Sequence, residues 1–234
     1  MSNYTFARYE EKYMLDRAQF EQLCEFFKDK TVPDEFPEYR VNNIYYDTSD
    51  YRIIRHSIEK PRYKEKLRLR YYGETLPQDG IVFLELKKKY RSIVYKRRIL
   101  LQYNLIDEFL NCPASFLSEI VEERFKQVAE EMKFFLSTLN DISNQILISY
   151  KRTALVGEDD MRITFDNDIL YNHEHEILPA DYVIMELKGN SSMPLEYAKF
   201  FSEKGIFPVS FSKYKTAYIK HIFKGEKDKS LCLI

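Results

Sequence analysis

The sequence predicts an α+β fold in which an antiparallel β-barrel, closed or nearly closed, forms a tunnel with helices packed outside. The first observation is a series of strand-like segments with Lys or Arg on one face and apolar residues on the other, most clearly at 64–70. The second is a set of segments between them with apolar residues at helical spacing. The chain also has no Gly/Ser linker, fixed-period repeat or low-complexity tract. We therefore expect a single domain over residues 1–234, with its core at about 4–224.

The first half of the chain is expected to begin with a strand at 4–14 followed by a helix. Asp16 is placed to cap that helix through about residue 28, with Phe20, Leu23 and Phe27 at helical spacing. Residues 32–37 contain two prolines and are expected to form a loop. The pattern then predicts a short helical piece at 50–59 and strands at 39–47, 62–72, 81–89 and 93–102.

The second half is expected to open with helix over 104–139, broken near Pro113, which suits the first turn of a new helix. An apolar stripe in this region is expected to pack on the sheet; it comprises Phe116, Ile120, Val121, Phe125, Val128 and Met132. Residues 157–160 are expected to link two strands tightly. The remaining expected elements are strands at 144–156, 160–167 and 181–189 and helices at 194–204 and 213–224.

Composition places the chain among globular proteins and limits its partners. It is 44% hydrophobic and 31% charged, and its formal net charge is −1, from 36 basic and 37 acidic residues. Overall charge therefore gives no reason to expect a nucleic-acid partner. The three cysteines, Cys24, Cys112 and Cys232, are far apart and odd in number, which favours a reducing compartment. With no apolar run approaching the ~20 residues that span a bilayer, we expect a cytoplasmic protein without a membrane segment.

Familiar catalytic motifs are absent from the sequence. There is no P-loop, GxGxxG, kinase signature, GxSxG or HExxH. His173 and His175 lie in a polar segment that is expected to be a solvated loop, because a metal site needs more converging ligands. Nucleophilic catalysis by serine or cysteine therefore has little support.

The repeated cations offer a different kind of chemistry. They lie either in solvent or inside the closed sheet, where their mutual repulsion requires a polyanion. The interior alternative is favoured because one sign of charge recurs on strands whose other faces are apolar and suited to helices. A few carboxylates share these faces, namely Glu10, Glu85, Asp166 and Glu186. Cations neutralise phosphate oxygens, and a carboxylate can hold a bridging Mg²⁺ or Mn²⁺.

Short motifs spread from about Phe6 to His221 resemble the polyphosphate polymerase domain of the vacuolar transporter chaperone (VTC) proteins, within the triphosphate tunnel metalloenzyme group. Each motif is weak, and their number, order and spacing make the resemblance specific. They are FARYEEKY (6–13), NIYYDT (43–48), KLRLRYY (66–72), FLELK (83–87), YKRR (95–98), SYKR (149–152), RITFD (162–166), MELK (185–188) and FSKY (211–214).

The resemblance implies transfer of the ATP γ-phosphate to a growing inorganic polyphosphate chain, with Mn²⁺ or Mg²⁺ as cofactor. It implies that Glu186 binds the metal and that Tyr150 and Ser212 donate hydroxyl hydrogen bonds to phosphate. Phosphate contacts are implied for Lys12, Arg68, Arg70, Lys87, Lys96, Arg152, Arg162 and Lys213. The strand pattern adds further candidates for substrate binding, namely Glu10, Lys66, Arg98 and Lys188.

One departure separates this chain from the hydrolytic members of the group. Arg8 stands where their Glu-x-Glu-x-Lys motif begins, which removes a metal carboxylate and favours polymerase over triphosphatase or cyclase. Two alternatives stay open: a tunnel triphosphatase acting on tripolyphosphate or an organic triphosphate, and a non-catalytic polyphosphate or nucleotide-binding module. We expect a standalone prokaryotic enzyme, because the chain lacks the sensor domain and membrane helices of the eukaryotic complex.

Overall fold

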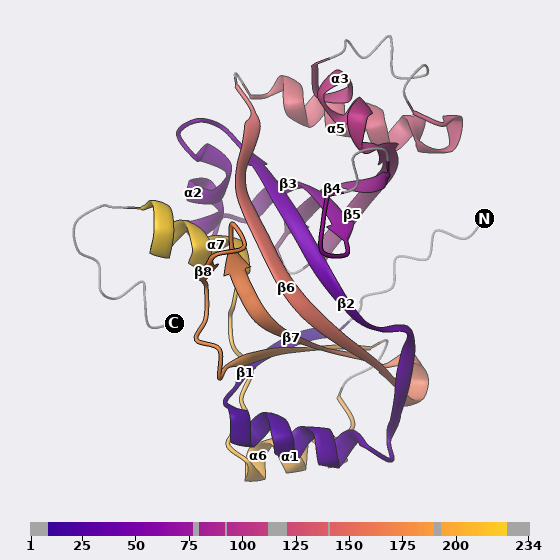
Figure 1. The fold of residues 1–234 in the computed structure, drawn as a ribbon, viewed down its shortest axis with the longest axis vertical. Helices are drawn as coiled ribbons and strands as arrows, with labels where there is room; N and C mark the ends of the chain where they lie inside the picture. The colour runs from indigo at the N-terminus through magenta and orange to yellow at the C-terminus, as the bar shows by residue number, and fades with distance from the viewer. Residues whose placement is uncertain are drawn as a thin grey trace. The chain divides into compact units, whose positions relative to one another are not determined.

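The computed structural model describes residues 9–76, 80–91, 93–111, 121–139, 141–189 and 193–223. It is an α+β fold with a large antiparallel sheet, in which the hydrogen-bonded order is β1-β9-β7-β6-β2-β3-β4-β5, with β8 pairing with β7 (Figure 1). The strands are β1 (Tyr9–Leu15), β2 (Thr31–Asp47), β3 (Tyr63–Tyr72), β4 (Ile81–Tyr90), β5 (Ile93–Gln102), β6 (Ser143–Gly157), β7 (Arg162–Tyr171), β8 (His175–Glu176) and β9 (Val183–Gly189).

Among the described residues, no strand pairing joins β1 to β5, so hydrogen bonding does not confirm the expected closed barrel. The chain divides into two compact units. Unit 1 contains the described parts of Met1–Arg40, Tyr150–Leu170 and Glu174–Ile234. Unit 2 contains those of Val41–Ser149 and Tyr171–His173. The long strands β2 and β6 each contribute residues to both units.

In unit 1, two helices cover the apolar face of β1, β9 and β7. They are α1 (Arg17–Phe27) and α6 (Leu195–Glu203), which lie side by side (Figure 1). The rings of Phe26 and Phe200 join them by stacking at 4.0 Å between centroids. Asp16 and Gln19 form a capping box at the start of α1, which confirms the predicted cap. The rest of this core includes Tyr13, Leu15, Leu23, Phe27, Ile163, Phe165, Met185, Leu187 and Phe201.

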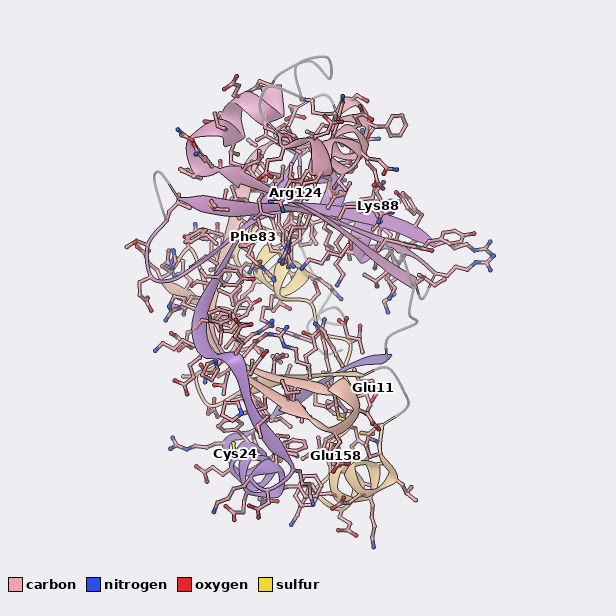
Figure 2. The ribbon with its side chains drawn as sticks, turned by 90° about the vertical axis from the view of Figure 1, so that its right-hand side faces the viewer. Glu11, Cys24, Phe83, Lys88, Arg124 and Glu158 are labelled. Carbon is pink, nitrogen blue, oxygen red and sulfur yellow. The ribbon has the colours of Figure 1, made fainter. Side chains whose placement is uncertain are left out.

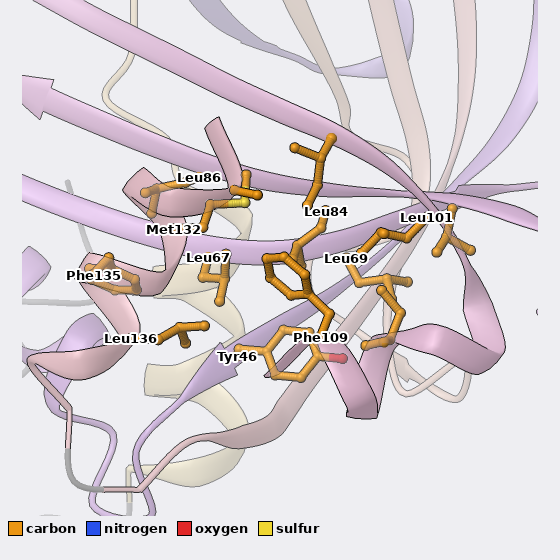
Figure 3. Close-up of a cluster of buried hydrophobic side chains, with 14 of the residues drawn as sticks. Tyr46, Leu67, Leu69, Leu84, Leu86, Leu101, Phe109, Met132, Phe135 and Leu136 are labelled. Atoms are coloured by element: carbon orange, nitrogen blue, oxygen red, sulfur yellow. The ribbon is translucent and has the colours of Figure 1, made fainter. Parts of the chain in front are cut away.

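In unit 2, helices α3 (Ile106–Asn111) and α5 (Lys126–Ser137) cover one face of β3, β4 and β5. Figure 3 shows the resulting core, in which Leu67, Leu69, Leu84 and Leu86 of the sheet meet Met132 and other helix residues. The short helix α2 (Arg52–Ile58) begins where the buried Asp47 carboxylate accepts hydrogen bonds from the amides of residues 53 and 54. The apolar side chains of β3, β4 and β5 thus lie on the face that the helices cover, and polar side chains lie on the other face.

Two further helices complete the description, and one predicted loop is wrong. Helix α7 (Lys213–Ala217) continues as a π-helical turn, η5 (Tyr218–Ile222), and short 3-10 turns lie at Tyr103–Leu105, Glu123–Phe125 and Glu158–Asp160. Residues 32–37, expected as a loop, belong to β2. Their prolines are tolerated because β2 pairs with β3 only from Val41 onward among the described residues, so one backbone edge needs no donors there.

Most predicted elements are confirmed to within a few residues. Of the predicted helical stripe, Val121, Phe125, Val128 and Met132 pack in the unit 2 core. Phe116 and Ile120 lie outside the described residues, as do Cys112, Cys232 and the break at Pro113. Cys24 is exposed with a free thiol.

Candidate functional site

A cluster of cations surrounds one carboxylate on the polar face of unit 2. The register of β3, β4 and β5 places it in two adjacent rows. One row is Arg68–Glu85–Arg98 and the next is Lys66–Lys87–Lys96. Arg70 lies one step further along β3 on the same face. We call these seven residues the Glu85 cluster; it holds six cations and one carboxylate.

Glu85 is the shared partner of four of these cations. Its carboxylate lies 2.7 Å from Arg68 Nη2, 2.6 Å from Lys96 Nζ and 3.9 Å from Arg70 Nε. Arg98 Nε donates to the same carboxylate at 2.7 Å. Because Glu85 has no exposed surface, a single buried negative charge holds several positive side chains in fixed positions.

Burial and neighbouring charge shift two pKa values in this cluster. Burial by itself raises the pKa of Glu85, but Arg68, Arg70 and Lys96 outweigh it and hold that pKa far below its usual range. Burial lowers the pKa of Lys96 to about 8, with Glu85 opposing the shift and Arg70 and Arg98 adding to it. The charged form of Lys96 is therefore disfavoured by burial and by its two arginine neighbours, although Glu85 lies 2.6 Å away.

Neighbouring side chains fix the orientation of the arginines. Asn43 Oδ1 accepts from Arg70 Nε at 2.9 Å, and both residues are buried. Tyr45 OH accepts from Arg68 Nη1 at 3.3 Å. The Arg98 guanidinium lies over the Phe83 ring, 4.5 Å from its centroid. These contacts pre-organise the donor groups before any ligand arrives.

The opposite face of the same strands carries cations of a different kind. Lys88 Nζ lies 2.8 Å from Glu131 of α5, and Arg97 Nε lies 2.9 Å from the same carboxylate. Strand alternation puts Lys88 and Phe83, both labelled in Figure 2, on opposite faces of β4, and Lys88 contacts helix α5. Each of these cations therefore belongs to the packing between sheet and helix, although it is adjacent in sequence to a residue of the Glu85 cluster.

A second polar cluster lies on the sheet face of unit 1. The register of β1, β9 and β7 gives the rows Lys12–Glu186–Thr164 and Glu10–Lys188–Arg162. Asp166 follows Thr164 on the same face of β7, and Tyr150 and Arg152 come from β6. We call Glu10, Lys12, Tyr150, Arg152, Thr164, Asp166, Glu186, Lys188 and Lys213 the Glu186 cluster.

Asp166 binds two cations firmly at one side of this cluster. Arg152 donates to its two carboxylate oxygens from Nε at 2.6 Å and Nη2 at 2.7 Å, a bidentate pair. Lys213 Nζ donates to Asp166 Oδ2 at 2.6 Å and lies 4.5 Å from the centroid of the Tyr150 ring. Lys213 can reach Asp166 because the chain that precedes it runs along β1, where the amide of Val209 donates to the Lys12 carbonyl.

Glu186 occupies the centre of the cluster with three cations near it. Its carboxylate lies 3.2 Å from Lys188 Nζ, 3.7 Å from Lys12 Nζ and 3.9 Å from Arg152 Nη2. Burial raises the pKa of Glu186, but Lys188, a hydrogen bond with Glu10, and then Lys12 and Arg152 bring it well below its usual value. Burial likewise raises the pKa of Asp166, and Lys213 and Arg152 lower it overall.

The structure thus places most of the predicted site residues in the Glu85 cluster or the Glu186 cluster. Arg162 and Ser212 belong to neither. Arg162 is directed toward β2, where its Nη2 lies 2.8 Å from Asp34. The Ser212 side chain accepts from the Lys215 amide and caps α7, a role that sequence reasoning did not assign to it. Arg8 lies outside the described residues.

Sequence reasoning missed several residues that organise the clusters. Glu85 and Asp166 were expected to face the same way as the cations, yet neither was assigned as a site residue. Asn43 and Tyr45 were also missed. The signal for the two carboxylates was present, since each follows the period-two pattern of a basic strand. A carboxylate buried among several cations is expected to form ion pairs with them, because an unpaired buried charge is costly.

The described residues contain no group of three or more His, Cys, Asp or Glu placed to hold a metal ion by themselves. Glu10 and Glu186 are neighbouring carboxylates in the Glu186 cluster, and Lys12 Nζ lies 3.8 Å from the first and 3.7 Å from the second. Within the part of the chain that the structure describes, no helix is long and apolar enough to cross a bilayer.

Comparison with known proteins places this arrangement in a family. The family model for the VTC domain matches residues 7–221. No curated protein sequence matches the chain.

Among solved structures, a candidate adenylate cyclase from Bacillus halodurans is similar with a TM-score of 0.57 and 15% identity, covering 87% of this chain and 92% of that one. A candidate adenylyl cyclase from Hippeastrum, described as having a dominant triphosphatase activity, gives 0.52 and 16%, covering 88% and 92%. These likenesses concern the fold. Together with the family match they confirm the resemblance predicted from the sequence motifs, and the chain belongs to the VTC domain family.

Proposed function

We propose that this protein is a metal-dependent polyphosphate polymerase that transfers the γ-phosphate of ATP to a growing inorganic polyphosphate chain inside a basic tunnel. The substrates are ATP and polyphosphate, and the residues of the Glu85 and Glu186 clusters bind phosphoryl groups. Membership in the VTC domain family supports this reaction class.

The observation that carries the proposal is the excess of positive charge in the Glu85 cluster. Six cations share one face with one carboxylate, and Arg70 is itself buried. Like charges at this density repel strongly where water is displaced, so an anion that binds on this face is strongly attracted. A chain of phosphates supplies negative charges at regular short spacing, and Arg grips each in a fork while Lys acts as a point charge.

The proposed transfer requires positioning and charge stabilisation. A terminal oxygen of the polyphosphate attacks the γ-phosphorus of ATP and forms the new P–O–P bond. The bond between that phosphorus and the β–γ bridging oxygen breaks, and ADP leaves with the electron pair. Fixed cations such as Arg152 and Lys213, both held by Asp166, stabilise the charge spread over the transferring oxygens.

A divalent metal ion fits the Glu186 cluster. Magnesium and manganese are commonly held by one or two carboxylates together with substrate phosphate oxygens, and Glu10 with Glu186 offers such a pair. When bound there, the metal would neutralise negative charge on the phosphates. Lys12 and Lys188, both near Glu186, then become available to contact phosphate.

The state of the buried carboxylates is compatible with transfer to phosphate, which needs no general base. The pKa values of Glu85, Asp166 and Glu186 are all lowered by cations, so none is tuned to take a proton from water near neutral pH. The terminal phosphate of an acceptor is already ionised and needs no base. A triphosphatase is the alternative, supported by the activity described for the Hippeastrum neighbour.

The test is to incubate purified protein with ATP and Mn²⁺, with and without a short polyphosphate primer, while following ADP, free phosphate and gel-resolved polymer. The proposal expects polymer and ADP to rise together. Arg70→Ala and Glu186→Gln should each reduce synthesis by about 10²- to 10³-fold. Arg97→Gln, on the opposite face of β5, is the matched charge-loss control and should keep full activity. Phosphate without polymer would identify a triphosphatase, and no turnover would contradict both enzymes.

A further inference from the structure

We propose that the hydroxyl of Thr164 is a phosphate-binding group that donates a hydrogen bond to a phosphoryl oxygen in the Glu186 cluster. The inference rests on the proposed function, because it assumes that phosphates bind on this face. It adds a neutral donor to a site otherwise composed of charged side chains.

The position of Thr164 follows from strand register. It lies directly opposite Glu186 on β9, and Glu186 lies opposite Lys12 on β1, so the three form one row across the sheet. Directly opposite residues in an antiparallel pair have Cβ atoms about 4.5–5.5 Å apart and point to the same face. Thr164 therefore lies beside Glu186 in the cluster, between Arg162 and Asp166 along its own strand.

The Thr164 hydroxyl is buried without a hydrogen-bond partner. The residue is 2% exposed, and its Oγ1 has no partner within the described part of the chain. Buried hydroxyls are nearly always hydrogen-bonded, because losing water without replacement costs free energy. An unpaired hydroxyl within a cluster whose other members already contact one another indicates a partner that arrives from outside.

The chemistry of the row selects the kind of partner. Lys188, Lys12 and Arg152 already lie 3.2, 3.7 and 3.9 Å from the Glu186 carboxylate, so its oxygens are well supplied with donors. A phosphoryl oxygen accepts hydrogen bonds only, and it is drawn here by Lys12, Lys188 and Arg152. The hydroxyl then acts as donor, and its contribution does not depend on the charge state of the side chain.

The experiment compares Thr164→Val, which keeps the branched shape without the hydroxyl, with Thr164→Ser, which keeps the hydroxyl. Calorimetric titration with tripolyphosphate gives affinity, and urea unfolding without ligand gives stability. We expect Thr164→Val to bind more weakly by about tenfold or more, the range for a hydrogen bond to a charged group. Its stability should equal or exceed that of the wild type, and Thr164→Ser should bind as the wild type does.

Ser149 provides a matched control. It is also buried with an unpartnered hydroxyl, but strand alternation places it on the opposite face of β6 from Tyr150 and Arg152. Ser149→Ala should leave the affinity unchanged. Equal binding by wild type and Thr164→Val would overturn the inference alone, as would a loss of stability in that variant without a loss of affinity. No binding by the wild type would overturn the proposed function as well.

Discussion

If the Glu85 cluster binds phosphate as proposed, Lys96 should make that binding dependent on pH in a range that is easily reached. Its pKa of about 8 means that the ammonium is charged below that value and neutral above it. A phosphate chain binds the charged form, so affinity for tripolyphosphate should fall as pH rises through about 8. The side chain is 42% exposed and screened by solvent, so we expect a fall of about three- to tenfold, measured by calorimetry.

Lys96→Arg separates this titration from that of the ligand. Arginine stays charged throughout the range, so the variant should show only the pH dependence that tripolyphosphate itself contributes. Wild-type binding near pH 8 should also take up protons, seen as a dependence of the heat on the buffer. Identical pH profiles for the two proteins would contradict the assignment.

Glu85 should be essential for stability because it is the only carboxylate in a cluster of six cations. Glu85→Gln leaves Arg68, Lys96 and Arg98 without their shared buried partner. Breaking a buried ion pair by removing one partner costs about 3–5 kcal/mol. We expect that loss in urea unfolding in phosphate-free buffer, with partial recovery on adding tripolyphosphate. Unchanged stability would show that Glu85 does not anchor the cluster.

Residue-level prediction from the sequence succeeded where one rule was sufficient. The period of two along a strand correctly grouped Lys66, Arg68 and Arg70 on one face. It could not show which carboxylate meets which cation, because that depends on register between strands distant in sequence. For the same reason Asp166, which holds both Arg152 and Lys213, was not assigned a role.

Strands β4 and β5 offer a direct test at the scale of an element. Arg98 faces the Glu85 cluster, whereas Arg97 pairs with Glu131 of α5 on the other face. Arg98→Gln should therefore weaken tripolyphosphate binding by about tenfold or more, within the 1.5–3 kcal/mol of a charged hydrogen bond. Arg97→Gln should leave the affinity unchanged, because Arg97 lies on the other face of the strand. It is a matched control, since both variants lose one positive charge from the same strand. Equal losses would indicate that general surface charge, and not the cluster, attracts the ligand.

A substitution in the hydrophobic core should have the opposite effects in β4, with a loss of stability and no loss of affinity. Leu84 is fully buried against the helices of unit 2, on the face opposite Glu85. Leu84→Ala should reduce the free energy of unfolding by about 2–5 kcal/mol. Binding of tripolyphosphate to the folded protein should be unaffected in calorimetry at low temperature. A marked loss of affinity would mean that the two faces of the sheet are not separable as described.

Element boundaries were predictable where local signals were strong, as at the Asp16 capping box. The wrong loop at 32–37 has a physical cause. Proline removes a backbone donor and is normally read as a strand breaker, but a strand with only one paired edge does not use every donor. Whether an edge is paired is a tertiary property, so the composition of this segment could not reveal it.

For the whole molecule, acidification should be destabilising because buried carboxylates are ionised when folded. The pKa values of Glu85, Asp166 and Glu186 are lowered relative to the unfolded chain, where they titrate near about 4. Their stabilisation is present above that range and is lost as pH falls below it, because the unfolded state then binds more protons. Urea unfolding should show stability declining steeply below about pH 4.5. A flat profile down to pH 3 would contradict the buried ion pairs.

The fold class and family were predictable from the sequence, because the short motifs are spread along the range that the family model matches. Whether the sheet closes into a barrel was not predictable. Alternation shows which face of a strand a residue occupies, but it does not show which strands pair with one another. The same holds for the division of the predicted site residues into a cation-rich cluster around Glu85 and a carboxylate-containing cluster around Glu186.

The most direct test of the central claim, that these sheet faces bind a chain of phosphates, is calorimetric titration of the wild-type protein with tripolyphosphate, with and without Mg²⁺. The account predicts saturable binding that weakens as salt concentration rises, because fixed cations provide the attraction. Absence of saturable binding in both buffers would contradict it.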